Sequence, residues 1–405
     1  MNPRLSALQA YPFERLNALK ANLKPATEAA HIALSIGEPK HAPPDFIVEA
    51  LQDNGLLRQG LGGYPATRGS DELRSAIADW ATQRFDLKPD TLTAEQHVLP
   101  VNGTREALFS FAQAVLSGSA DSVVVMPNPF YQIYEGAALL GGAQPWYVPC
   151  PAENGLLPDF DSVPEAVWRR TELLYLCSPG NPTGAVVDLS GLKRLIELAD
   201  RFDFIIAADE CYSEIYFDES QPPAGLLEAC AKLGRDDYRR CVVFHSLSKR
   251  SNLPGLRSGF VAGDARILAQ YYQYRTYHGC AMAGHVQAVS AMAWRDEAHV
   301  TANRALYREK FTQVTPVLQQ VLDVQIPQAG FYYWPATPTD DETFAQRLFE
   351  QCHITVLPGT YLGRQPTAET GGAGPNPGSG RIRMALVASL DECLQAAERI
   401  RQLSL

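Results

Sequence analysis

Five short, unbroken hydrophobic runs recur along the middle of the chain, and helical patterns separate them. The runs cover residues 122–127, 173–179, 204–210, 241–248 and 258–263. A hydrophobic run without polar alternation is typical of a strand that helices cover on both faces. The pattern therefore predicts an α/β fold with a largely parallel central sheet, and it leaves the order of the strands open.

The segments between these runs repeat hydrophobic residues at the spacing of a helix. "TREALFSFAQAVLSG", residues 104–118, is the longest example, and "LKRLIELADRF", residues 192–202, repeats the pattern more briefly. A stripe of this kind predicts an amphipathic helix whose hydrophobic side packs against the sheet.

The pattern changes in the last third of the chain. From about Ala265 it becomes mostly helical, and it then mixes short strands and helices in "GFYYW", "ITVLP", "RIRMALV" and "DECLQAAERIRQL". We expect a large domain over residues 51–290 and a smaller α+β domain over 291–405, to which residues 1–50 contribute an N-terminal arm and part of the fold. Residues 367–380 are too rich in Gly and Pro for a regular element and predict a loop.

Composition and charge restrict the classes of function. The 405 residues carry a formal net charge of -10 and include eight cysteines and eight histidines. The negative charge disfavours nucleic-acid binding, and neither a membrane-spanning run nor the order of a signal peptide is apparent. The cysteines form no C-x-x-C pair and the histidines no pair of ligand spacing, so we expect reduced thiols, no metal and a cytoplasmic location.

The first candidate for chemistry follows the fourth hydrophobic run, because ligands bind at the carboxyl ends of strands in open α/β sheets. There, "HSLSKRSNLPGLRSG" places Lys249 among Ser246, Ser248 and Arg257. A lysine becomes a nucleophile when burial and nearby cations lower its pKa, and hydroxyls with an arginine can bind a phosphate. Taken alone, Lys249 could equally be a lysine that only extends from a strand end.

A second anion-binding feature opens the helical pattern of residues 104–118. Gly103, Thr104 and Arg105 stand at its start in "NGTREALF". Free backbone N–H groups at the start of a helix attract an anion, and glycine allows the anion a close approach. Ordinary helix capping explains most such starts, so this feature gains weight only from the others.

Asp209 ends the third hydrophobic run in "FIIAADECY", and Tyr212 follows three residues later. A buried carboxylate needs a cation, which could be a core arginine or a protonated ring nitrogen of a ligand. Raising the pKa of such a nitrogen by two units requires about 2.7 kcal/mol, and a carboxylate near 4 Å supplies roughly 4 kcal/mol at an effective dielectric of about 20. A ring nitrogen is therefore an adequate partner for Asp209, and Tyr212 would face the same ligand.

Three further side chains extend this set. Asn181 stands between two X-Pro bonds in "SPGNPTG", where cis bonds that fix its orientation are expected, although an ordinary surface turn is the alternative. Tyr131 could stack on a planar ring or simply fill the core. Of Arg381 and Arg383 we expect Arg383 to face inward and pair with a carboxylate, because it directly precedes the apolar "MALV".

Together these residues describe a planar, phosphorylated aldehyde with a ring nitrogen, which is pyridoxal 5′-phosphate held on Lys249 as an imine. The motifs "NPTG", "ADECY" and "SLSKRSNLPGLRSG" follow one another in this order, and the chain resembles the class I/II aminotransferases of fold type I from "ALSIGEP" to "RIRMALV". The resemblance implies that Lys249 also transfers the substrate proton and that Asp209 holds the ring nitrogen. It implies that Asn181 and Tyr212 bind the ring hydroxyl and that Tyr131 stacks on the ring.

The resemblance also assigns the two anionic groups of the site. Six residues would bind the cofactor phosphate: Gly103, Thr104, Arg105, Ser246, Ser248 and Arg257. Arg383, with Asn181 and the backbone of Gly37, would bind the substrate α-carboxylate. Tyr64, in "GGYPATRGSDELR", would reach the phosphate of the neighbouring subunit, which implies a homodimer.

Within the family, "YRTYHGCAMAGHVQ" is most similar to N-succinyldiaminopimelate aminotransferases. This similarity implies an N-succinyl-LL-2,6-diaminopimelate:2-oxoglutarate aminotransferase of bacterial lysine biosynthesis, EC 2.6.1.17. Arg275 and His278 are candidates for the distal carboxylate, although a structural role explains each more simply. The alternatives that stay open are an aminotransferase of aspartate, alanine or LL-diaminopimelate, a C–S lyase, and a cofactor-binding regulatory module.

Overall fold

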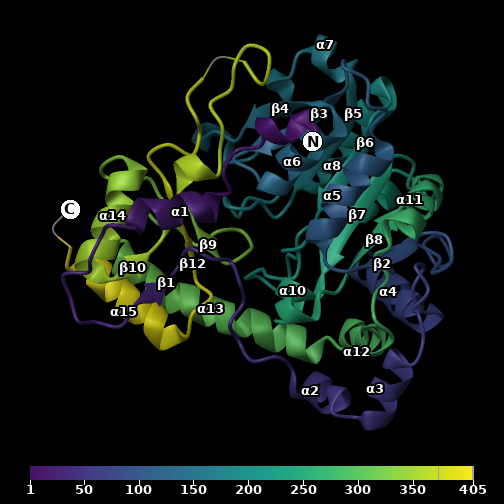
Figure 1. The fold of residues 1–405 in the computed structure, drawn as a ribbon, viewed down its shortest axis with the longest axis horizontal. Coiled ribbons are helices and arrows are strands. Elements are labelled where there is room, and N and C mark those ends of the chain that lie inside the picture. Colours follow the sequence, from purple (N-terminus) through teal and green to yellow (C-terminus); the bar gives the residue numbers. More distant parts are fainter. Residues whose placement is uncertain (373, 404–405) are drawn as a thin grey trace.

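A seven-stranded sheet forms the centre of the computed structural model, which describes residues 1–372 and 374–403 (Figure 1). Its order is β2-β8-β7-β6-β5-β3-β4. The strands are β2 (Val98–Val101), β3 (Val123–Asn128), β4 (Gln144–Pro149), β5 (Thr171–Cys177), β6 (Ile205–Asp209), β7 (Cys241–Ser246) and β8 (Gly259–Gly263). The strands from β4 to β7 in this order are parallel, and β8 is antiparallel to both β7 and β2. The predicted α/β fold with a largely parallel sheet is confirmed.

Alternate residues of each central strand pack on opposite faces, which explains the unbroken hydrophobic runs. In β5, Leu174 and Leu176 belong to one hydrophobic cluster, and Leu173 and Tyr175 belong to another. The first cluster includes α4 (Asp71–Arg84), α8 (Leu189–Phe202), α9 (Leu226–Lys232) and α12 (Gly284–Arg295), and the second includes α5 (Thr104–Val115), α6 (Gln132–Gly141) and α11 (Ala265–His278). The sheet is therefore the middle layer of three.

Three features of the central layer differ from the pattern. Strands β2 and β4 lie outside the five hydrophobic runs. The run 241–248 contains the whole of strand β7 and the start of a helix, because α10 (Leu247–Arg250) begins directly after β7. Lys249 therefore extends from a single helical turn at the carboxyl edge of the sheet.

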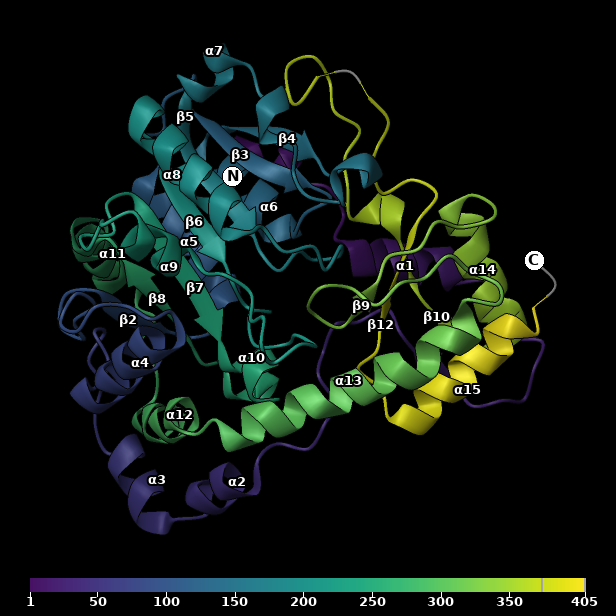
Figure 2. The ribbon, with the colours of Figure 1, turned by 180° about the vertical axis from the view of Figure 1, so that it is seen from behind.

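The C-terminal third builds a second hydrophobic cluster. A three-stranded antiparallel sheet of order β11-β12-β9 contains β9 (Tyr332–Tyr333), β11 (Leu357–Pro358) and β12 (Ile382–Ala385). Helices α13 (Ala298–Leu318), α14 (Asp341–Cys352) and α15 (Leu390–Arg401) pack with it, and β1 (Ile32–Ala33) pairs in parallel with β10 (Ile354–Thr355). Figure 2 shows α13 passing from the vicinity of α10 to α15. The boundaries 1–50, 51–290 and 291–405 stay a proposal.

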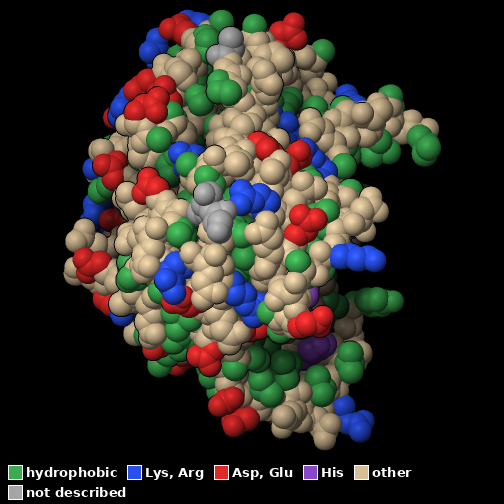
Figure 3. Space-filling view, turned by 90° about the vertical axis from the view of Figure 1, so that its left-hand side faces the viewer, with side chains coloured by type: hydrophobic (Ala, Val, Ile, Leu, Met, Phe, Trp, Pro, Cys, Tyr) green, Lys and Arg blue, Asp and Glu red, His purple; other side chains and the backbone are tan. Residues whose placement is uncertain are grey.

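The remaining elements are short. They are η1 (Pro3–Ala7), α1 (Pro12–Lys20), α2 (Asp45–Leu51), α3 (Asn54–Leu61), η2 (Ala152–Asn154), η3 (Phe160–Ser162), α7 (Glu165–Trp168), η4 (Pro254–Leu256) and η5 (Gly359–Tyr361). Among the described residues, no helix is both long and apolar enough to span a membrane. Figure 3 shows acidic and basic side chains interspersed over one face of the molecule.

The predicted loop over residues 367–380 has no helix or strand among its described residues. It lies along the edge strand β4, where the Tyr147 N–H donates to the Thr370 carbonyl at 2.7 Å. The Gln144 side-chain amide donates to the Glu369 carbonyl at 2.8 Å. The loop therefore occupies part of the hydrogen-bonding edge of the central sheet.

Candidate active site

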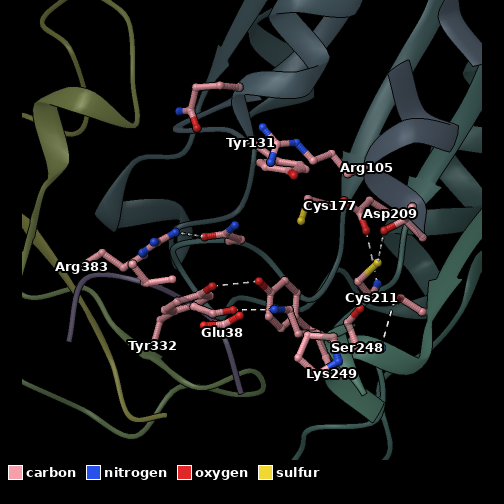
Figure 4. Close-up of a pocket in the computed structure, with 18 of the residues that line it drawn as sticks. Glu38, Arg105, Tyr131, Cys177, Asp209, Cys211, Ser248, Lys249, Tyr332 and Arg383 are labelled. Atoms are coloured by element: carbon pink, nitrogen blue, oxygen red, sulfur yellow. Dashed lines mark hydrogen bonds between the residues drawn. The ribbon is translucent and has the colours of Figure 1, made fainter. Parts of the chain in front are cut away.

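A cavity of about 610 Å³ opens where the carboxyl ends of the central strands meet the C-terminal elements (Figure 4). Most of the predicted site residues line it: Gly37, Thr104, Arg105, Tyr131, Asn181, Asp209, Tyr212, Ser246, Ser248, Lys249, Arg257 and Arg383. These residues come from the whole length of the chain, so only the fold brings them together.

Two predicted residues do not line this cavity. Gly103 is the N-cap of α5, with a φ of 84° that favours glycine, and a Cβ there would lie 2.9 Å from Cζ of Arg257. The glycine therefore lets the Arg257 guanidinium approach the start of α5. Tyr64 is fully exposed between α3 and α4 and lines a separate groove, so its contact with a neighbouring subunit stays a prediction.

The two candidates for a distal carboxylate also lie outside the cavity lining. Arg275 is buried and forms an ion pair with Glu106, with 2.9 Å between Nη1 and Oε1. It also donates to the carbonyl of Cys280 at 2.8 Å. His278 is exposed at the end of α11. Arg275 is therefore occupied by structural contacts, which is the simpler of its two interpretations.

Lys249 reaches into the cavity, where its Nζ donates to the carbonyl of Gly37. Burial lowers the pKa of Lys249 to about 8, the positive charges of Arg383 and Arg257 act in the same direction, and Cys211 and Glu38 oppose them. A lysine with this pKa has an appreciable unprotonated fraction near neutral pH, as a nucleophile or proton acceptor requires.

Asp209 is buried at the end of β6, and two groups donate to its carboxylate. The Tyr134 hydroxyl lies 2.6 Å from Oδ2, and the Cys211 N–H lies 3.3 Å from Oδ1. Burial raises the pKa of Asp209, and the hydrogen bonds from Cys211 and Tyr134 lower it. No arginine of the described chain pairs with Asp209, so a core arginine is not its partner. A cation supplied by a ligand in the cavity fits this carboxylate.

Several side chains in the site were not predicted from the sequence. Tyr134 follows Tyr131 by one turn of α6, and this spacing is the signal that could have found it. Cys177 and Cys211 place their sulfur atoms in the cavity wall beside Asp209 (Figure 4). Cys177 lies within the hydrophobic run 173–179 and Cys211 directly follows the run 204–210, so both look like apolar core residues in the sequence.

The opposite wall carries the candidate carboxylate site. Both X-Pro bonds of "SPGNPTG" are cis. Arg383 on β12 donates from Nη1 to Oδ1 of Asn181 at 3.0 Å and from Nη2 to the Ser35 carbonyl at 2.7 Å, while its buried Nε has no partner. Tyr332, which was also not predicted, meets Tyr212 with 2.8 Å between the hydroxyl oxygens. A fixed, buried cation is therefore available to an anion in the cavity.

A second anion site lies at the start of α5 and α10. The hydroxyl of Ser246 accepts the Ser248 N–H at 3.1 Å, which turns the chain from β7 into α10. Arg257 is held by a bond from Nη1 to the Pro254 carbonyl at 2.8 Å. Helix α5 begins at Thr104 with no side-chain cap, so its first N–H groups are available to an anion.

An anion site, a buried carboxylate without a cation, a lysine of lowered pKa and the ring of Tyr131 together fit pyridoxal 5′-phosphate. The fold and the site thus define an enzyme of the pyridoxal-phosphate α/β class. The family model of class I and II aminotransferases matches residues 29–400, and the chain belongs to this family. It is a pyridoxal-phosphate-dependent aminotransferase.

Individual relatives share the whole fold. The chain is 31% identical over 406 residues to an LL-diaminopimelate aminotransferase of Syntrophobacter fumaroxidans, covering 99% of this chain and 98% of that protein. It is 49% identical to an aminotransferase of Neisseria meningitidis of known structure, with a TM-score of 0.92 and 99% of each chain covered. A probable N-succinyldiaminopimelate aminotransferase of Thermus thermophilus is 26% identical, with a TM-score of 0.81, covering 96% of this chain and 99% of that one.

The contact between Tyr134 and Asp209 leads to a first testable prediction. We expect Tyr134→Phe to lower kcat/KM by about tenfold, since a hydrogen bond to a charged group contributes about 1.5 kcal/mol or more. Initial rates and the pH dependence of cofactor absorbance would measure the change. Tyr175→Phe is the control, because Tyr175 stacks on Tyr134 with 4.6 Å between ring centroids and its hydroxyl bonds to the Leu108 carbonyl instead. Equal losses in both variants would assign the effect to packing.

Proposed function

We propose that this aminotransferase acts on a long amino acid with a carboxylate at each end, and that diaminopimelate is that amino acid. The observation that carries the proposal is a second cation in the cavity. Besides Arg383, Arg105 lines the cavity with its guanidinium 5.2 Å from the ring centroid of Tyr11, and it forms no ion pair within the described chain. Figure 4 shows Arg105 beside Tyr131 and away from Arg383. A substrate with two separated carboxylates suits these two arginines.

The cavity residues would hold the cofactor by its ring and its phosphate. Asp209 would pair with the ring nitrogen, Tyr212 and Asn181 would bind the ring hydroxyl, and Tyr131 would stack on the ring. The phosphate would meet the anion site: Gly103, the N–H groups of Thr104 and Arg105, and the side chains of Ser246, Ser248 and Arg257. When bound, pyridoxal 5′-phosphate takes the amino group from one amino acid and passes it to a 2-oxo acid.

The protein's own contribution is orientation, exclusion of water and proton transfer. Arg383, held by Asn181 and Ser35, would fix the substrate α-carboxylate so that its Cα faces Lys249. The amine of Lys249, with a pKa of about 8, would accept the Cα proton and return it at a neighbouring carbon. Glutamate and 2-oxoglutarate would serve as the second pair of substrates, because they too carry two carboxylates.

Two diaminopimelates are candidates for the long substrate. LL-diaminopimelate comes first, because it is the substrate named for the Syntrophobacter relative, which matches 99% of this chain. The N-succinyl compound comes second, supported by the likeness to the Thermus structure, and its distal end would use Arg105 alone.

A panel of amino donors tests this proposal. We expect the conversion of the cofactor to its amino form, followed by absorbance, to be at least about tenfold more efficient with a diaminopimelate than with alanine. Arg105→Met should lower kcat/KM for glutamate and diaminopimelate by about thirtyfold and leave alanine unchanged, since a hydrogen bond to a charged group contributes about 2 kcal/mol. Arg105→Lys, which keeps the charge, is the matched control.

The outcomes of the panel separate the candidates. Faster reaction with N-succinyl-diaminopimelate than with the free compound would favour the second candidate over the first. If alanine or aspartate reacted as well as either diaminopimelate, the proposed substrate would be wrong and the aminotransferase class would stand.

We also propose that the enzyme is a homodimer in the cytoplasm. The exposed Tyr64 supports the dimer, because its hydroxyl is free to reach a neighbouring subunit. Sedimentation of the purified protein at micromolar concentration would reveal a monomer if this proposal failed.

A further inference from the structure

A series of hydrogen bonds joins two buried side chains, Lys310 and Asn303, through the half-buried His41, and none of the three lines the cavity. Lys310 Nζ is 2.6 Å from Nε2 of His41, and Nδ1 of His41 is 2.9 Å from Oδ1 of Asn303. Asn303 then donates from Nδ2 to the backbone carbonyl of Lys249 at 3.2 Å. Lys310 and Asn303 are each 3% exposed, so water does not substitute for these contacts.

The hydrogen bonds that join Lys310, His41 and Asn303 fit only one assignment of donors and acceptors. An ammonium at Lys310 can only donate, so His41 Nε2 accepts and its Nδ1 carries the proton. Nδ1 then donates to Oδ1 of Asn303, which also accepts the side-chain amide of Asn252 at 2.8 Å. This leaves the Asn303 amide nitrogen as the donor. Burial lowers the pKa of His41, which keeps its ring neutral, as an acceptor must be.

The Asn303 end of this series of hydrogen bonds contacts the last carbonyl groups of α10. This helix is one turn long, so its last carbonyls have no partner within it. The Asn303 amide contacts the carbonyls of Lys249 and, at 3.4 Å, of Arg250. Asn303 lies on α13, whose remaining turns pack in the C-terminal cluster. A side chain from that helix therefore closes the end of the turn that bears Lys249.

Lys249 is thus held at both ends by connected groups. Its Nζ donates to the Gly37 carbonyl, and its backbone carbonyl accepts from Asn303. Gly37 and His41 lie four residues apart on one connecting segment, and His41 bonds to Asn303. We propose that His41 and Asn303 are positioning residues that keep the Lys249 amine desolvated, with Lys310 fixing the orientation of the His41 ring.

The proposal predicts a change in the Lys249 amine itself, independent of turnover. In the full-length chain freed of cofactor, labelling of each lysine by cyanate at pH 8 can be followed by peptide mass spectrometry. If Asn303→Ala or His41→Phe lets water reach Lys249 and raises its pKa from about 8 to about 9, the unprotonated fraction at pH 8 falls about fivefold. We expect a fivefold slower labelling of Lys249 in both variants. In the holoenzyme, the pH midpoint of cofactor absorbance should shift as well.

Thr315→Val is the matched control. Thr315 is a buried polar residue of the same helix, its hydroxyl lies 2.6 Å from that of Tyr333, and it has no link to Lys249. It should lower the unfolding temperature and leave Lys249 labelling unchanged. The ring centroids of His41 and Tyr307 are 4.5 Å apart, and His41→Phe keeps an aromatic ring in this contact. We therefore expect this variant to fold even if Asn303→Ala does not. Unchanged labelling and an unchanged absorbance midpoint in a folded His41→Phe variant would overturn the proposal.

Discussion

Replacing Lys249 with alanine is expected to lower kcat by at least about ten-thousandfold. In the proposed function one amine both binds the cofactor covalently and moves the substrate proton, and general acid–base catalysis alone contributes about 10²- to 10⁴-fold. Steady-state rates with glutamate as donor would measure the loss. Treatment with borohydride, which fixes the cofactor to the wild-type lysine, should leave the alanine variant free of cofactor after denaturation.

The matched change Lys249→Arg keeps a positive charge and should lose as much activity as the alanine variant. The lowered pKa of Lys249 also predicts how cofactor binding depends on pH. Below about pH 8 the amine is protonated and cannot attack the cofactor, so covalent uptake of cofactor by the apoenzyme should accelerate as the pH rises through 8. Normal turnover by the alanine variant, with cofactor still fixed by borohydride, would contradict the assignment of Lys249.

Replacing Asp209 with asparagine should lower kcat/KM by about a thousandfold. Asparagine has the same shape but no charge, and a carboxylate near 4 Å from a ring cation is worth roughly 4 kcal/mol at an effective dielectric of about 20. The variant should also bind the cofactor more weakly, which dialysis followed by absorbance would show. Asp209→Glu serves as the comparison, because it retains the charge at a changed position.

The double variant Asp209→Asn with Tyr134→Phe makes this prediction specific. Once the carboxylate is gone, the Tyr134 hydroxyl has no charged acceptor, so removing it should cost much less than in the wild type. Independent, additive losses from the two changes would show that Tyr134 does not act through Asp209.

The sequence predicted those parts of the fold that depend on local pattern. The parallel strands showed as hydrophobic runs because both of their faces are covered, and the residues that end those runs gathered in one cavity. β2 was missed because it has only four residues, "VLPV", and β4 because a glutamine and a proline at its start break the hydrophobic run of "QPWYVP". Their place in the sheet depends on pairing with β8 and β3, which no local window of sequence contains.

The site residues that the sequence did not predict are those whose role depends on contacts between distant parts of the chain. Tyr134 and Tyr332 look like core aromatics in the sequence, and only their hydroxyl contacts to Asp209 and Tyr212 distinguish them. No motif marks the sequence around His41, Asn303 or Lys310. The packing of α13 against the segment after Gly37 brings these three residues together. Long-range hydrogen bonds of this kind leave no spacing for a motif to record.

The loop along β4 has a consequence for the solubility of the enzyme. An outermost strand with free N–H and C=O groups is a template on which other chains can add strands. Here the carbonyls of Glu369 and Thr370 already take donors from Gln144 and Tyr147. A deletion that shortened residues 367–380 would uncover the Tyr147 N–H on this edge, and we expect the shortened enzyme to aggregate more readily.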